Sequence, residues 1–255
     1  MSAKKEQEKR REERLQAEEG AEGRERRQRM IKLASATAFL AIAVVLVLIV
    51  ISQSQTDGGD TDLEGTAEVS AALKGIDQRD LVLGASTAKV TLVEFGDLQC
   101  PACKSFAESV VSQVIDSKVR SGEAKIEFRS YTILGEESVV AGAAAIAAGR
   151  QGRGWDFVEL FYRNQGFEHS GYVTDDFLTE IARGAGVPDL KQWNADRKSK
   201  RVLDQVLRTA SEAEELGFGS TPSFAVEGPA TDGLEPLDFP ESAGSLEEAI
   251  AQASG

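Results

Sequence analysis

The sequence predicts an α/β domain that follows a single membrane-spanning helix. Residues 90–95 are rich in β-branched residues and largely apolar on both faces, which is typical of a buried central strand. A helical pattern comes next, then a second strand and a long helical block, and a strand pattern returns only near the C-terminus. This alternation predicts the α/β class. Far upstream, an uncharged apolar run at 33–51 predicts the membrane span.

The apolar run at 33–51 is long enough to cross a bilayer. Its 19 residues carry no charge, and a helix needs ~20 residues to span the hydrocarbon core. A cleaved secretory signal is the alternative, but its apolar core is normally only ~7–15 residues and ends in small residues suited to cleavage. Here Ile51 is followed by Ser-Gln-Ser-Gln. We therefore expect a transmembrane helix.

The flanking charges predict how this helix is oriented. Residues 1–32 contain 11 Lys and Arg and 8 Asp and Glu, and no basic residue lies between Leu33 and Leu73. The positive-inside rule predicts a cytoplasmic N-terminus and an extracytoplasmic C-terminal region. Because the first 32 residues have no apolar stripe, we interpret them as a solvated cytoplasmic tail, with a cytosolic docking helix as the alternative.

Beyond the span, we expect a flexible linker at 52–80 and a folded domain at 81–255. The linker begins with a stretch rich in Ser, Gln, Thr, Asp and Gly. The chain after the span holds 18 basic and 34 acidic residues, a net charge of −16. This excess argues against nucleic acid or an anionic lipid surface as a partner, because both bind basic patches.

The remaining elements of the domain have their own patterns. Thr174 is expected to cap a helix, and Ser245 with Glu248 fits a capping box that begins the last helix. The helical insertion covers about 136–217. The expected elements are a strand near 125–132, helices at 138–148, 155–162 and 175–183, a longer helical pattern at 190–216, and a strand at 223–226.

The two cysteines, Cys100 and Cys103, are separated only by Pro101 and Ala102. A disulfide between them closes too small a loop to stabilise the fold much, so the pair is better suited to reactivity. Because strand gives way to helix here, we expect Cys100 at the N-cap, Pro101 at N1 and Cys103 one turn deeper. The free N–H groups of the first turn then favour a thiolate at Cys100, the nucleophile of disulfide exchange.

Other chemistries for a Cys-x-x-Cys pair fit this chain less well. Structural zinc takes four Cys or His ligands, and the chain has two cysteines and one histidine, His169, so zinc would need a second chain. Copper sites favour Cys and Met, and both methionines, Met1 and Met30, precede the exported domain. A serine hydrolase would need His169 as its base, and there is no nucleophile elbow. We therefore expect redox chemistry and no metal.

From about residue 90 to the C-terminus, the sequence resembles the DsbA-like branch of the thioredoxin superfamily. The resemblance implies a thioredoxin fold with an inserted helical subdomain, because Pro222 lies 119 positions after Cys103. It also implies a membrane-anchored thiol–disulfide oxidoreductase that needs no organic cofactor. The motifs that carry it are Val93-Glu-Phe-Gly-Asp97, Cys100-Pro-Ala-Cys103 and Gly219-Ser-Thr-Pro222-Ser-Phe224.

The resemblance also implies roles for individual residues. Pro222 matches the family's cis-proline beside the redox cysteines, and Thr221 matches the residue whose backbone pairs with an extended substrate. Pro101 and Ala102 belong to the same substrate-binding surface. Strongly oxidising members carry His where this chain has Ala102, which implies a less oxidising couple. Glu94 matches a buried carboxylate that shuttles the proton of the deeper cysteine, the alternative being a strand carboxylate that reaches solvent.

We expect oxidation of dithiols in exported proteins: a substrate thiolate attacks Cys100, and a second substrate thiolate releases the reduced enzyme. Two alternatives stay open. One is a reductase or isomerase of the same fold, in which Cys103 resolves the mixed disulfide. The other is a tethered binding module whose cysteines form a passive disulfide or bind a metal. The expected partners are exported proteins with thiols or disulfides and a membrane redox partner, either a quinone-linked oxidoreductase or a small oxidant.

Overall fold

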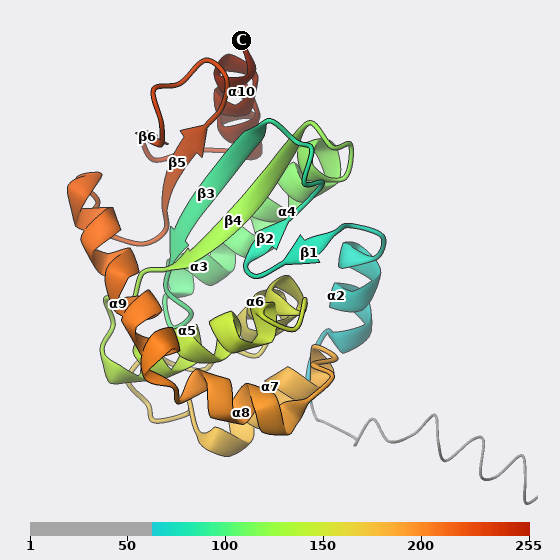
Figure 1. Cartoon of the computed structure of the whole chain (residues 1–255), viewed down its shortest axis with the longest axis vertical. Coiled ribbons are helices and arrows are strands. Elements are labelled where there is room, and N and C mark those ends of the chain that lie inside the picture. The colour runs from blue at the N-terminus through green and yellow to red at the C-terminus, as the bar shows by residue number, and fades with distance from the viewer. Residues whose placement is uncertain (1–62) are drawn as a thin grey trace, which may run out of the picture. The chain divides into compact units, whose positions relative to one another are not determined.

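The computed structural model describes residues 63–255, which are coloured in Figure 1. The expected cytoplasmic tail at 1–32, the expected transmembrane helix at 33–51 and the first part of the linker lie outside the described residues. Within residues 63–255, no helix combines the length and the apolar character that crossing a membrane requires.

A mixed β-sheet lies at the centre of the described region, with strand order β1-β2-β4-β3-β5-β6. The parallel pair β3 and β4 occupies its middle, and every other pairing is antiparallel. The longer strands confirm those predicted, whereas the three two-residue strands were not predicted. The strands are β1 (Gln78–Arg79), β2 (Val82–Leu83), β3 (Val90–Gly96), β4 (Ala124–Ser130), β5 (Ser223–Glu227) and β6 (Glu235–Pro236).

Strand β3 is buried on both faces because helices cover both sides of the sheet. Val93 and Phe95 belong to a small apolar cluster with Ala213 of α9 (Lys200–Glu215). Leu92 belongs to the main core, which includes the helices that follow the cysteines and α10 (Ala243–Ser254). Since side chains alternate along a strand, Glu94 lies on the same face as Leu92, toward the helix that carries the cysteines.

That helix runs over residues 101–119 without a break in direction. It alternates α-helical segments with wider π-type turns, and such turns are often found near functional sites. Its buried side chains, which include Cys103 and Val111, pack into the main core. The segments are α3 (Pro101–Phe106), the π-turn Ala107–Val111, α4 (Ser112–Val114) and the π-turn Ile115–Val119.

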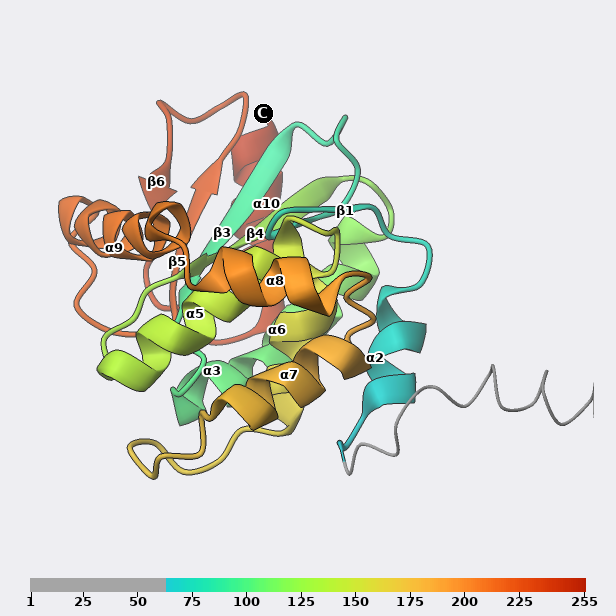
Figure 2. The ribbon, with the colours of Figure 1, turned by 60° about the horizontal axis from the view of Figure 1, so that its bottom comes forward.

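A block of five helices is inserted between β4 and β5. Its members gather around α5 (Figure 2), and the indole N–H of Trp193 donates to the carbonyl of Ala144 at 2.9 Å, which ties α8 to α5. The predicted long pattern at 190–216 is two helices, because the Ser199 hydroxyl caps the second one. The helices are α5 (Glu136–Gly149), α6 (Gly154–Arg163), α7 (Asp175–Gly184), α8 (Leu190–Arg197) and α9 (Lys200–Glu215).

Two boundary predictions are wrong. The predicted linker at 52–80 contains helix α2 (Thr66–Leu73), whose Val69 and Leu73 are buried and which packs on α6. Two apolar residues one turn apart are enough to dock a short helix, although its surroundings are polar in sequence. The last helix begins at Ala243 instead of after Ser245, because Ser242 is its N-cap and accepts the N–H of Ser245 at 3.4 Å.

Candidate redox site

The two cysteines lie at the start of α3, in the arrangement that the sequence predicted. Cys100 is the N-cap residue and Pro101 follows at N1. Cys103 is fully buried, Cys100 keeps 8% of its surface exposed, and Pro101 and Ala102 between them are exposed. The thiols are not joined in a disulfide, so the structure represents the reduced pair. Both cysteines are buried, and Cys100 is the one that keeps some contact with solvent.

The surroundings of Cys100 favour its thiolate. Its pKa is lowered from 9.0 to about 6, chiefly by a hydrogen bond from the Cys103 thiol. The Thr221 side chain and the backbone N–H groups of Cys103 and Ala102 act in the same direction, and partial burial opposes them. Burial and the neighbouring Cys100 raise the pKa of Cys103, so the deeper thiol keeps its proton. At neutral pH Cys100 is therefore mainly a thiolate, which is the nucleophile in disulfide exchange.

The turn before β5 faces the accessible sulfur. The Thr221–Pro222 peptide bond is cis, as the family resemblance implied. The sulfur of Cys100 lies 3.4 Å from the carbonyl oxygen of Thr221, to which the thiol form donates. The Thr221 hydroxyl is buried and has no other partner among residues 63–255, so it is available to the thiolate. Pro222 is buried beside it.

Glu94 lies under the cysteines and not at the surface. Its side chain is 1% exposed, and its Oε1 atom has no hydrogen-bond partner within the described chain. Burial, then the charges of Glu159 and Cys100, raise its pKa from 4.5 to about 8. Glu94 also contributes to the raised pKa of Cys103. The alternative of a solvent-facing strand carboxylate is therefore wrong.

Asp97 fixes the loop between β3 and α3. Its side chain is fully buried, and its carboxylate accepts the backbone N–H groups of Gln99 at 2.9 Å, Ile133 at 2.9 Å and Leu134 at 3.0 Å. These bonds tie the residues before Cys100 to the segment after β4. The sequence predicted no role for Asp97, although a Gly-Asp pair directly after a strand is a signal for such a turn.

The inserted helical block also holds this loop. The side-chain amide of Gln165, just after α6, donates to the carbonyls of Leu98 at 2.7 Å and Cys100 at 3.1 Å. The buried Gln99 amide donates to the Ser138 hydroxyl of α5 at 3.0 Å. No sequence pattern marked these glutamines, because the contacts join residues 39 to 67 positions apart. The block therefore helps to position Cys100.

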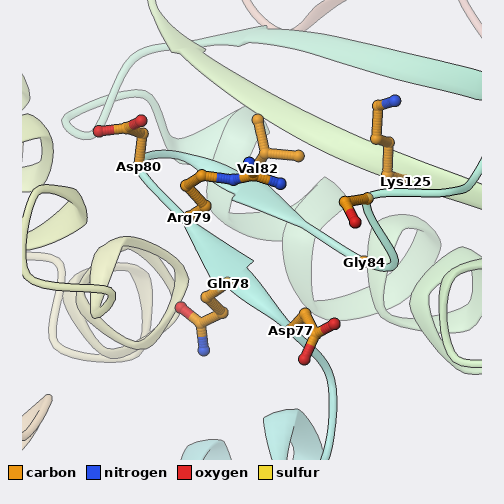
Figure 3. A pocket seen from close by; sticks show the side chains of 8 residues that line it. Asp77, Gln78, Arg79, Asp80, Val82, Gly84 and Lys125 are labelled. Atoms are coloured by element: carbon orange, nitrogen blue, oxygen red, sulfur yellow. The ribbon is translucent and has the colours of Figure 1, made fainter.

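A separate cavity of about 480 Å³ lies at the β1–β2 hairpin (Figure 3). Asp77, Arg79, Asp80 and Lys125 contribute to its lining, and none of the candidate redox residues does. Within residues 63–255, no group of three or more His, Cys, Asp or Glu side chains is arranged to hold a metal ion.

Sequence comparison defines the class of this protein. The thioredoxin family model matches residues 77–242, which is more than half of the chain. The probable disulfide bond formation protein D of Bacillus cereus is 29% identical over 150 residues, covering 57% of this chain and 69% of that protein. The chain is a thiol–disulfide oxidoreductase.

Solved structures agree with this class. A thioredoxin-like oxidoreductase from Silicibacter pomeroyi superposes with a TM-score of 0.54 and 31% identity, covering 68% of this chain and 90% of that one. Oxidised BdbD from Bacillus subtilis superposes with a TM-score of 0.60 and 21% identity over 70% of this chain and 97% of that one, a likeness of fold. The chain belongs to the thioredoxin family and carries a block of five helices inserted between β4 and β5.

Proposed function

We propose that this chain is a membrane-tethered, extracytoplasmic oxidase that transfers a Cys100–Cys103 disulfide to the dithiols of exported proteins. The observation that carries the proposal is the asymmetry of the pair: Cys100 is accessible with a pKa of about 6, and Cys103 is buried with a raised pKa. A thiol of low pKa is both available as a thiolate and a good leaving group.

The exchange balances without a cofactor. A substrate thiolate bonds to the sulfur of Cys100, the Cys100–Cys103 bond breaks, and Cys103 keeps the electron pair and takes up a proton. A second substrate thiolate then attacks the substrate sulfur of the mixed disulfide, and Cys100 leaves as a thiolate. The substrate is oxidised to a disulfide and the enzyme is reduced. A membrane quinone-linked oxidoreductase or a small oxidant must restore the enzyme disulfide.

Stabilisation of the Cys100 thiolate makes the couple more oxidising. A pKa of about 6 lowers the free energy of the reduced form at pH 7 by about 1.4 kcal/mol, which corresponds to about 30 mV. This is a modest effect, consistent with Ala102 in place of His between the cysteines. The proposal therefore requires a reduction potential above the ~−270 mV of thioredoxin and below the ~−120 mV of DsbA.

Equilibration of the full chain with glutathione buffers measures this potential. A value between these limits, together with oxidation of a reduced, unfolded protein in the presence of an oxidant, supports the oxidase. A potential below ~−270 mV would instead establish a reductase. This second candidate is supported by the sequence between the cysteines, which holds Pro101 and Ala102 and no histidine. An inactive chain would leave only a binding module.

The tether rests on the sequence. The uncharged run at 33–51 and the basic residues before it support a single-pass anchor with a cytoplasmic N-terminus, and the names of the bacterial relatives support exported proteins as substrates. Membranes should retain the chain after an alkaline carbonate wash. Protease added outside intact spheroplasts should digest the domain at 63–255. Recovery of the chain in the soluble fraction would contradict the anchor.

A further inference from the structure

Helix α6 carries a second carboxylate, that of the partly buried Glu159, whose charge acts on Glu94. Glu159, Tyr162 and Arg163 share one face of α6, because residues three and four apart are neighbours on a helix. A Cβ atom built on Gly96 would lie 3.1 Å from the Tyr162 hydroxyl and 3.2 Å from Oε1 of Glu94. This face of α6 therefore abuts the Glu94 carboxylate, and a glycine at position 96 keeps the space between them open.

The polar groups in this region are not saturated. Oε1 of Glu94, Oε1 of Glu159 and Nε of Arg163 are all buried without a hydrogen-bond partner among residues 63–255. Buried polar atoms are nearly always paired with protein or water, and exceptions frequently have a functional reason. Oε1 of Glu94 and Oε1 of Glu159 are thus polar atoms that the described residues leave unpaired at the contact of β3 with α6, and Nε of Arg163 lies beside Gly65, just before α2.

Glu159 connects this interior region with the outside. Its Oε1 atom is enclosed, while the residue as a whole is only partly buried. Glu159 and Arg163 line a cavity of about 70 Å³ together with Glu108, an exposed residue, and with Val69 of α2. A cavity of this size is large enough for water. Helix α2 thus lines one side of a small cavity to which Glu159, Arg163 and the exposed Glu108 also contribute.

The electrostatics of both carboxyl groups suit proton transfer near neutral pH. Burial raises the pKa of Glu159 from 4.5 to about 7, with Arg163 lowering it and Glu108 raising it. Burial and the Glu159 charge raise the pKa of Glu94 to about 8. Proton exchange is most effective when the pKa values of donor and acceptor lie close to each other and to the working pH.

We propose that Glu159 is a relay residue that carries the proton of the redox reaction between buried Glu94 and solvent in the cavity under α2. The inference rests on the proposed function. When a substrate thiolate opens the Cys100–Cys103 disulfide, Cys103 keeps the electron pair and takes a proton from Glu94. Glu94 recovers a proton from Glu159, and Glu159 recovers one from solvent. In the opposite direction every proton moves outward along the same path.

Other ionisable groups face the two carboxyls and will shape any pH profile. Cys100, Cys103 and Tyr162 interact with Glu94. Arg163 and Glu108 interact with Glu159. Asp116 also lines the cavity under α2. The test must therefore separate the ionisation of Glu159 from those of its neighbours.

The decisive variant is Glu159→Gln, which keeps the shape of the side chain and removes its ionisation. Single-turnover oxidation of a dithiol peptide by the oxidised full chain is followed from pH 5 to 9. We expect the rate at pH 7 to fall roughly tenfold, which is less than the whole contribution that general acid–base catalysis usually makes to a rate. We also expect the inflection of the rate near pH 7 to disappear. Glu159→Asp, which still titrates, should recover part of the rate and the inflection.

Two controls separate a relay from a structural effect. Glu180→Gln removes an exposed carboxylate on α7 and should behave as the wild type does. The pH dependence of Cys100 alkylation should be the same in Glu159→Gln and wild type, because the thiolate itself is not part of the relay. Loss of rate accompanied by a shift in the Cys100 titration would overturn the relay in favour of a packing defect.

The outcome also distinguishes failure of the relay from failure of the proposed function. If wild type oxidises the peptide and Glu159→Gln does so at the same rate with the same inflection, the relay is wrong and the oxidase stands. If wild type itself transfers no disulfide, the proposed function fails first, and the relay fails with it.

Discussion

The two faces of strand β3 differ in what they bury. On the face toward α9, Val93 and Phe95 pack in a cluster with Ala213, Ala225 and Tyr131 that contains no buried carboxylate. On the face toward the cysteines, Glu94 is buried at 1% exposure without a hydrogen-bond partner for its Oε1 atom among residues 63–255. An unpaired buried carboxylate costs free energy. One face of the strand therefore stabilises the fold, whereas the other carries a destabilising titratable group beside the redox pair.

The largest expected effect is on the redox face, at Cys100. Replacing Cys100 by Ser removes the only accessible sulfur of the described pair, so we expect disulfide transfer to be abolished, at least a thousandfold below wild type by analogy with the loss of other catalytic nucleophiles. The measurement is single-turnover oxidation of a dithiol peptide. Ser105→Ala, at an exposed position of the same helix, should keep full activity. Residual activity in the Ser variant would place the nucleophile elsewhere.

The apolar face should respond in stability and not in chemistry. Phe95 is fully buried, and its ring lies 5.3 Å from that of Phe218. Truncating it to Ala should lower the free energy of unfolding by about 3–5 kcal/mol, measured by urea denaturation, while the pKa of Cys100 stays near 6. Phe167→Ala, at a position 89% exposed, should change little. A shift of the Cys100 titration in the Phe95 variant would show that the two faces are coupled.

Replacing the buried carboxylate of Glu94 by an amide should lower the rate of disulfide transfer and raise the stability of the fold above neutral pH. We expect Glu94→Gln to slow disulfide transfer by about a hundredfold, as for loss of a general acid–base group. The folded-state pKa of Glu94 is raised from 4.5 to about 8. The protonated form of Glu94 is favoured in the folded state, so its contribution to the free energy of unfolding is fully present below pH 4.5 and is lost as the pH rises through 8.

The stability half of this prediction is tested on the oxidised chain, in which the cysteines do not titrate. The unfolding free energy of wild type should fall by several kcal/mol between pH 5 and 9, and Glu94→Gln should show a clearly smaller decline, because only Glu159 of the two raised carboxyls still titrates in this range. The matched comparison is Glu127→Gln, a partly exposed carboxylate on the neighbouring strand β4. Equal slopes in wild type and Glu94→Gln would mean that Glu94 is not the buried titrating group.

The smallest expected effect concerns Thr221. Its hydroxyl helps to lower the pKa of Cys100, and Thr221→Val keeps the shape of the side chain without the donor. We expect the pKa of Cys100 to rise by about one unit, which is the size of one hydrogen bond to a charged group. The measurement is the thiolate absorbance at 240 nm. An unchanged pKa would assign the shift to Cys103 and the helix N-terminus alone.

Sequence patterns predicted the parts of the fold that carry strong periodicity. Residues 90–95 were identified as a central strand because they are apolar on both faces, and the strand-to-helix transition placed Cys100 at the N-cap. Helix α2 was missed because only Val69 and Leu73 anchor it, within a polar stretch. A strand carboxylate can face either side of a sheet, so burial of Glu94 follows only from the register of β3 against its neighbours.

The contacts that complete the site could not be predicted, because they join segments far apart in sequence. The Gln165 side chain donates to the carbonyl of Cys100, which lies 65 positions earlier in the sequence. Glu159 belongs to helix α6, whose apolar periodicity predicts which face is buried but not where its polar side chains lie. Nothing in the local sequence of α6 indicates that its polar residues face Glu94. Long-range placement of single polar groups depends on the tertiary arrangement of helices that periodicity leaves undetermined.

The pH dependence of Cys100 alkylation tests the central claim most directly. The reduced full chain is treated with iodoacetamide from pH 4 to 10, with Cys103→Ala as a comparison that lacks the main hydrogen bond to the thiolate. We predict a half-maximal rate near pH 6 in wild type and a markedly higher midpoint in the variant. A wild-type midpoint near the ordinary value of 9.0 would contradict the account, because the accessible sulfur would then be a thiol at neutral pH.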